Sequence, residues 1–155
     1  MKINIYVIGR IKACPEAVLI NDYIGRFNRI GRNIGLGPIK VIEKEAKKSG
    51  ILSEGKVLIN SIPDNSIICI LDEKGVDLDS FAFAKKIEFW RDNQNLDLSL
   101  IIGGSGGLSK EIKSKADNSI SLGKMVWPHR LVRVMITEQL YRAASIISGS
   151  PYHKD

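Results

Sequence analysis

Cysteine is scarce in this chain, which has only Cys14 and Cys69 among its 155 residues. The two lie far apart in the sequence and belong to no CxxC motif or cysteine–histidine pattern. A disulfide scaffold and a zinc site are therefore both disfavoured, and this use of cysteine is typical of a reducing cytoplasm. No other group of residues has the spacing of metal ligands, so we expect a cytoplasmic protein without a metal.

Long apolar runs are also missing. None reaches the roughly 18 residues that a membrane-spanning helix requires, so we expect no membrane partner. The opening stretch, MKINIYVIGRIK, lacks the small-residue cleavage site of a signal peptide and predicts a strand instead. With 44% hydrophobic and 26% charged residues, the chain can bury a core, and we expect a single domain over residues 1–155.

The formal net charge is +6, and the basic residues are spread along the chain rather than gathered in one block. This balance fits a polyanionic partner such as RNA, which basic side chains bind through its phosphates. On charge alone, an ordinary basic protein fits equally well. If RNA is the partner, the spacing favours a folded surface patch over a basic tail.

Short apolar runs alternate with helical patterns along the chain. We expect strands at 3–8, 39–43, 66–72, 98–104 and 119–122, and helices at 15–30, about 80–92, 109–115 and 128–149, with a further helix between the second and third strands. This alternation predicts an α/β fold, a mostly parallel sheet with helices on both faces. Ligands of such sheets bind outside the carboxyl ends of the strands. We therefore expect a pocket where three strand ends meet: Leu71-Asp72-Glu73, the loop from Gly103 and the segment after Leu122.

The loop within IIGGSGGLSKEI, residues 101–112, carries four glycines after a buried strand. Their spacing matches neither the dinucleotide fingerprint nor the phosphate-binding P-loop. A Rossmann-type nucleotide site is also disfavoured, because the first strand leads into IGRIKACPEA, which has a single glycine. Glycines at such a place usually let the backbone come close to a ligand. We therefore expect the loop to leave room for a small ligand of another kind.

The C-terminal third holds both histidines, His129 and His153, and either can donate or accept a proton near neutral pH. His129 could equally pack or cap the helix that begins beside it. Glu138 and Arg142 are spaced to pair on that helix, while Arg133 can point elsewhere, toward phosphate or a carboxylate. The helix is apolar on more than one side, which predicts burial either against a partner subunit or at the centre of the core.

Three segments give the chain a specific resemblance: LIIGGSGGL (100–108), WPHRLVRVMITEQLYRA (127–143) and PYHK (151–154). Through them the chain resembles, over essentially its whole length, the RlmH family of SPOUT-class methyltransferases. Members methylate the N3 position of a pseudouridine in large-subunit (23S) ribosomal RNA, with S-adenosyl-L-methionine as donor. The resemblance implies this activity, a C-terminal trefoil knot and a homodimer. Since no separate RNA-binding domain is evident, the substrate is expected within the assembled ribosome.

Carried over by position, the resemblance implies a cofactor pocket lined by Leu71, Gly103, Leu122, Gly123, Lys124, Met125, Val126 and Trp127. In the final helix and tail, it matches His129, Arg133, Glu138, Gln139, Tyr141, Arg142, Tyr152 and His153. Among these we expect His153 or Tyr152 to lie near the nucleobase. We expect Arg133 or Arg142 to contact phosphate or to orient the substrate. Some members have Arg where this chain has Lys154. Both side chains can contact phosphate, but lysine cannot form the planar bidentate contact that arginine forms. Residues 151–155 are expected to complete the active site and could do so across a dimer interface.

Two other functions stay open at this point. One is a non-catalytic RNA-binding or ribosome-associated module that retains a vestigial pocket, which the basic charge fits equally well. The other is a related SPOUT methyltransferase that acts on tRNA. Retention of the glycine loop together with the C-terminal residues favours the enzyme over the module.

Overall fold

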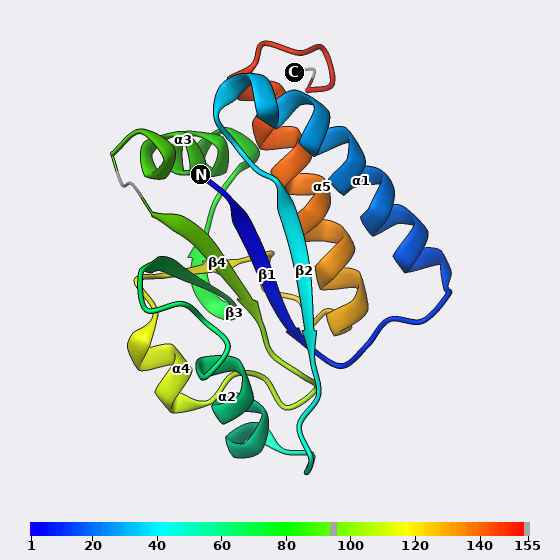
Figure 1. The fold of residues 1–155 in the computed structure, drawn as a ribbon, viewed down its shortest axis with the longest axis vertical. Helices are drawn as coiled ribbons and strands as arrows, with labels where there is room; N and C mark the ends of the chain where they lie inside the picture. The colour runs from blue at the N-terminus through cyan, green and yellow to red at the C-terminus, as the bar shows by residue number, and fades with distance from the viewer. Residues whose placement is uncertain (94–95, 154–155) are drawn as a thin grey trace.

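The structure of the protein, a computed structural model, describes residues 1–93 and 96–153 (Figure 1). Its centre is a five-stranded sheet with the order β2-β1-β4-β3-β5, in which all neighbouring strands are parallel. The strands are β1 (Ile3–Ile8), β2 (Ile39–Lys44), β3 (Ser66–Asp77), β4 (Asp97–Ile102) and β5 (Asn118–Ser121). The predicted parallel α/β sheet is confirmed, while the trefoil knot stays a prediction from the resemblance.

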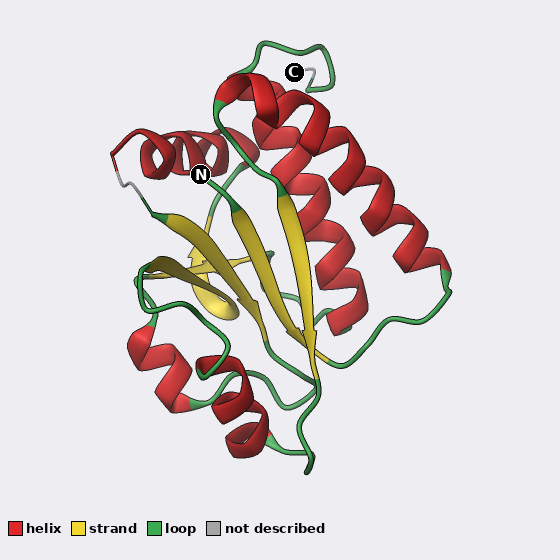
Figure 2. Cartoon of the chain, viewed as in Figure 1, coloured by secondary structure: helices red, strands yellow, loops and turns green. Residues whose placement is uncertain are grey.

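Helices cover both faces of the sheet, as predicted (Figure 2). They are α1 (Pro15–Gly31), α2 (Ile51–Ile59), α3 (Ser80–Asn93), α4 (Lys110–Lys115) and α5 (His129–Ile147), and a short 3-10 turn, η1 (Arg32–Ile34), follows α1. On one face lie α1, α3 and α5, and on the other lie α2 and α4. Within residues 1–93 and 96–153, no helix has both the length and the apolar character needed to cross a bilayer.

Each face of the sheet has its own apolar core, because successive strand residues point to opposite faces. In β1, Ile5 belongs to the core shared with α1, α3 and α5, whereas the neighbouring Tyr6 belongs to the core beneath α2 and α4. Isoleucine is the commonest residue in the strands, which suits strands covered on both sides. The sheet is thereby buried between two apolar cores, one on each face.

The last helix, α5, packs between α1 and α3 on the first face. Its buried residues include Ile136, Leu140 and Ala144, all at most 1% exposed. Packing inside one chain therefore covers much of the apolar surface of α5, while Leu131 remains 40% exposed, so burial against a partner subunit stays a prediction. Pro128 serves as the N-cap residue and the helix proper begins at His129, one residue later than predicted.

The sequence predicts that strand β3 ends at Leu71-Asp72-Glu73. In the structure the strand continues to Asp77. Both Leu71 and Val76 pair with Ile120 of β5, so the residues between them form a bulge. Gly75 lies against the β5 backbone, where an added Cβ atom would come within 2.6 Å of the Ile120 carbonyl carbon. The bulge pushes Asp72 and Glu73 out of the regular strand, toward the carboxyl edge of the sheet.

Candidate active site

A cavity of about 510 Å³ lies at the carboxyl edge of β3, β4 and β5. Its walls are the β3 bulge, the glycine loop after β4, the segment after β5 and the first turn of α5. The three strand ends singled out in the sequence therefore do meet, and the volume is in the range of small-molecule sites. Of the eight residues expected to bind the cofactor, seven line this cavity: Leu71, Gly103, Leu122, Gly123, Met125, Val126 and Trp127. The eighth, Lys124, does not.

The glycine loop is a tight turn that folds back on itself. The Gly107 amide donates to the Gly104 carbonyl oxygen at 3.0 Å, and Gly107 has a left-handed φ of 81°. A Cβ atom on Gly103 would lie 2.6 Å from the Gly107 carbonyl oxygen. The missing side chain of Gly103 thus makes room for the loop's own backbone, which corrects our expectation that this glycine leaves room directly for a ligand.

The segment between β5 and α5 forms the opposite wall and is braced internally. Ser121 Oγ accepts from the Gly123 amide at 3.1 Å and donates to the Gly123 carbonyl oxygen at 2.9 Å, and Trp127 Nε1 donates to the Leu122 carbonyl oxygen at 3.3 Å. Met125 and Val126 nevertheless remain 68% and 83% exposed. Apolar side chains that open at the mouth of a cavity are suited to contact a bound ligand or a partner.

Polar side chains on the cavity wall include His129 and Asp72. Burial of the His129 ring, followed by the charges of Arg133 and Arg130, lowers the pKa of His129, so the ring is neutral at pH 7. Burial of the Asp72 carboxyl raises its pKa, but an ion pair with Lys113 and a hydrogen bond from the Lys74 amide outweigh burial and hold the pKa below its usual value.

A second group of functional candidates gathers around the Glu138 carboxylate, further along α5. Its Oε1 atom accepts from Arg142 Nε at 3.0 Å, from Arg142 Nη2 at 2.6 Å and from the Tyr152 hydroxyl at 3.0 Å. Its Oε2 atom accepts from Gln139 Nε2 at 2.7 Å, and Ser80 Oγ donates to Gln139 Oε1 at 2.9 Å. The predicted pair of Glu138 and Arg142 is present, and it also fastens the tail to the helix.

The tail residues lie on this cluster, as expected for residues that act together. Arg142 Nη1 is 3.1 Å from His153 Nδ1, and the His153 ring meets the Phe81 ring edge-on at 4.6 Å. Tyr152 packs on the ring of Tyr141, with ring centroids 4.4 Å apart. Burial, followed by the hydrogen bond to Glu138, raises the pKa of Tyr152, so its phenol stays protonated. Lys154 and Asp155 lie outside the described residues.

Arg133 does not join the other three expected catalytic residues. Its side chain is 2% exposed, and Nη2 donates to the carbonyl oxygens of Ile8 at 2.7 Å and Gly9 at 3.0 Å, while Nη1 pairs with Glu43 at 3.2 Å. The enclosed guanidinium pairs with a carboxylate, one of the two kinds of partner expected from the sequence, and its contact with phosphate or its role in orientation stays a prediction. The guanidinium fastens α5 to the carboxyl ends of β1 and β2.

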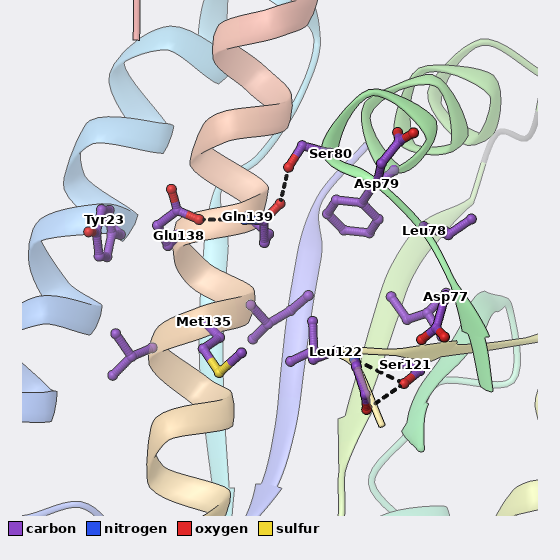
Figure 3. A pocket seen from close by; sticks show the side chains of 15 residues that line it. Tyr23, Asp77, Leu78, Asp79, Ser80, Ser121, Leu122, Met135, Glu138 and Gln139 are labelled. Carbon is purple, nitrogen blue, oxygen red and sulfur yellow. Dashed lines mark hydrogen bonds between the residues drawn. The ribbon is translucent and has the colours of Figure 1, made fainter. Parts of the chain in front are cut away.

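The two clusters lie apart along α5. Val132 lines the first cavity and Arg142 is ten residues further on, about 15 Å along the helix axis. Between them is a second cavity of about 660 Å³, which shares Leu122 and Gly123 with the first and reaches Glu138 and Gln139. Figure 3 shows Met135, Glu138 and Gln139 on one side of this second cavity, opposite Asp77 and Leu78. Tyr152, His153 and Arg142 line neither cavity.

Some of these residues escaped the sequence analysis. Nothing in the sequence pattern singles out Lys113, and Asp72 stands out only as part of a strand end. Their ion pair could not be foreseen, because it depends on the β3 bulge and on the position of α4.

In the described part of the chain, no three His, Cys, Asp or Glu side chains are grouped closely enough to hold a metal ion.

A parallel sheet with a glycine-lined cavity at its carboxyl edge defines the class of α/β proteins that bind a small ligand at this place. The family described as "Predicted SPOUT methyltransferase" matches residues 1–153. Two relatives carry the name "Ribosomal RNA large subunit methyltransferase H". The one from Ruegeria sp. (strain TM1040) is 49% identical over 155 residues and 99% of each chain. The one from Roseobacter denitrificans is 50% identical over 156 residues and 100% of each chain. This protein therefore belongs to the SPOUT methyltransferases and, among them, to the RlmH family.

A solved structure supports the fold alone. It is described as "The structure of a probable methylase family protein from Haemophilus influenzae Rd KW20", is 14% identical and has a TM-score of 0.51. The similarity covers 99% of this chain and 70% of that chain. At this identity, the similarity shows a shared fold and carries no argument about substrate.

Proposed function

We propose that the protein transfers a methyl group from S-adenosyl-L-methionine to the N3 position of a pseudouridine in large-subunit ribosomal RNA. The observation that carries this proposal is the cavity at the carboxyl edge, where seven of the eight residues expected around the donor come together. The name shared by relatives 49% and 50% identical over the whole chain supports the RNA substrate.

The cavity fits this donor in size and chemistry. Apolar side chains of Leu71, Leu122 and Trp127 offer a surface for an adenine ring, and the glycine loop offers backbone groups. The donor carries no phosphate, which agrees with a loop that follows no phosphate-binding pattern. When bound, the donor supplies an activated methyl group on a sulfonium, and the chain has to align the acceptor nitrogen with it.

The tail residues are suited to hold the nucleobase. Arginine can only donate hydrogen bonds, so in the contact at 3.1 Å Arg142 is the donor and His153 Nδ1 the acceptor. The tail thereby brings the His153 ring and the Arg142 guanidinium together, and such groups can stabilise the negative charge that grows on the base as N3 loses its proton. The Tyr152 hydroxyl donates its proton to the hydrogen bond with Glu138, so Tyr152 cannot accept a proton from the nucleobase while that bond persists. A role for His153 as proton acceptor would require it to leave Arg142 first.

We propose a homodimer in which the tail of one protomer faces the donor cavity of the other. The support is the separation of about 15 Å along α5 between Val132 of the cavity and Arg142 of the tail cluster within one chain. The exposed apolar residues Met125, Val126 and Leu131 near the cavity mouth fit a surface that a second copy covers. The net charge of +6 fits a ribosomal partner, and the reaction then takes place in the cytoplasm.

Labelled methyl transfer tests the proposal. The protein is incubated with labelled S-adenosyl-L-methionine and, separately, with ribosomes that lack the modification, with free 23S RNA and with tRNA. Label in the 23S RNA of ribosomes is the expected result. Label in tRNA alone would point to another SPOUT activity, and donor binding without any transfer would favour a non-catalytic ribosome-binding module.

A further inference from the structure

The donor cavity has one charged wall, formed by Asp72 and Lys113. Asp72 comes from the β3 bulge and Lys113 from α4, and their side chains form an ion pair. Both residues line the cavity. The Asp72 side chain is 9% exposed and the Lys113 side chain 43%, so the carboxylate is enclosed while the ammonium borders the opening.

Both charges are held on firm supports. Oδ1 of Asp72 accepts from the Lys74 amide at 2.9 Å, and Lys113 contacts Oδ2. Helix α4 is anchored by Ser109, whose Oγ accepts from the Ile112 amide at 3.3 Å, and by Ile112 itself, which is 1% exposed. A pair fixed in this way keeps its position before any ligand arrives.

The rest of the cavity has a different character. The glycine loop contributes backbone, and Leu122, Met125, Val126 and Trp127 contribute apolar side chains. Besides the pair, Glu73 is the only other Asp, Glu, Lys or Arg among the described residues that line the cavity, and it is exposed. The cavity therefore suits a ligand that has an uncharged, flat part at one end and both charges of an amino acid at the other.

We propose that Asp72 and Lys113 bind the amino-acid end of the methyl donor, Asp72 the α-ammonium and Lys113 the α-carboxylate. This inference rests on the proposed function and extends it, because it fixes which way the donor lies. The pair neutralises itself without a ligand, and the amino-acid end of the donor adds two opposite charges at once, so this end of the cavity buries no unpaired charge in either state. Each contact is a charge-assisted hydrogen bond. The nucleoside end is then left to the segment 122–127.

Calorimetry with matched ligands tests the assignment on the full-length chain. S-adenosylhomocysteine and 5′-methylthioadenosine share the adenosine and an uncharged sulfur, but only the first has the amino-acid end. Lys113→Met and Asp72→Asn should each weaken S-adenosylhomocysteine binding about tenfold or more and change methylthioadenosine binding less than twofold. Lys113→Arg should keep most of the affinity. Lys110→Met, on the same helix but outside the cavity, is the matched control and should change neither.

The outcomes separate this inference from the proposed function. Equal losses for the two ligands, or no loss for either, would overturn the assignment and leave the pair as a tie between β3 and α4. Wild-type protein that binds neither S-adenosyl-L-methionine nor S-adenosylhomocysteine would overturn the proposed function and this inference with it. Circular dichroism and thermal unfolding of each variant exclude misfolding as the cause of a loss.

Discussion

The Tyr152 hydroxyl donates to Oε1 of Glu138 at 3.0 Å, the same oxygen that receives both hydrogen bonds from Arg142. One carboxylate oxygen thus ties the C-terminal tail to the arginine that contacts His153. The negative charge at this point contributes strongly to the position of the tail, because hydrogen bonds to a charged acceptor are about twice as strong as neutral ones. It acts together with the ring contacts of Tyr152 and His153.

Glu138→Gln should therefore release the tail while leaving the donor cavity intact. We expect methyl transfer to fall by about tenfold to a hundredfold, corresponding to roughly 1.5–3 kcal/mol for hydrogen bonds to a charged group. Donor affinity, measured by calorimetry, should change less than twofold, because Glu138 does not line the first cavity. Transfer at the wild-type rate would show that the tail is positioned by something else.

Arg133→Met should reduce stability. The substitution removes donors from the carbonyl oxygens of Ile8 and Gly9 and removes the charged partner of Glu43, which keeps the hydrogen bond from the Ile11 amide. Loss of one member of a buried pair costs about 3 kcal/mol or more, which urea unfolding can measure. The exposed neighbour Arg130 provides the control variant, Arg130→Met. Weaker RNA binding without a loss of stability would instead restore the predicted role of Arg133 at the substrate.

Gly103→Val should weaken donor binding by distorting the glycine loop, since its side chain would collide with the Gly107 backbone. A matched control is Gly25→Ala in α1, where an added Cβ atom meets nothing within 4 Å and helix propensity favours alanine. Calorimetry on both folded variants should show a loss of donor affinity for the first alone. Unchanged affinity in Gly103→Val would remove this loop from the donor site.

His129 should make stability depend on pH. Its pKa is lowered in the folded protein, so between the folded and unfolded pKa values the unfolded chain binds more protons. The His129 contribution is constant above the unfolded pKa, near 6.5, and the free energy of unfolding falls as the pH drops from there toward the folded pKa. His129→Gln should flatten this part of the curve in urea titrations between about pH 7 and pH 5. An equally steep curve in the variant would assign the effect to other groups.

Binding to ribosomes should weaken as salt rises, with log K falling linearly with log salt, because basic side chains displace counterions from phosphates. Binding measured at several salt concentrations gives the slope directly. A flat response between low and moderate salt would show that the net charge of +6 is incidental.

Much of this architecture could be predicted because it depends on local pattern. Apolar runs such as the one from Ser66 mark buried strands, and the spacing of Glu138 and Arg142 fixes an ion pair within one helix. The continuation of β3 past Leu71 could not be predicted, since Gly75 is required by the Ile120 backbone, which is remote in sequence.

The same limit applies at the site. Arg133 looked free to reach a substrate, and only the three-dimensional approach of β1 and β2 encloses it. The ion pair of Asp72 and Lys113 likewise joins residues 41 positions apart, on a bulge and a short helix whose relative position the sequence does not encode locally.

Methyl transfer by mixed dimers shows whether the donor cavity of one chain and the tail of another make one methylating site. A protomer lacking residues 152–155 is paired with a Gly103→Val protomer, and verified heterodimers are incubated with ribosomes that lack the modification. We expect each homodimer to be inactive and the mixed dimer to form N3-methylpseudouridine in 23S RNA, detected by mass spectrometry of its nucleosides. A mixed dimer that forms none, beside a wild-type dimer that does, would contradict a site shared between protomers, and full activity in the simple tail deletion would remove the tail from the mechanism.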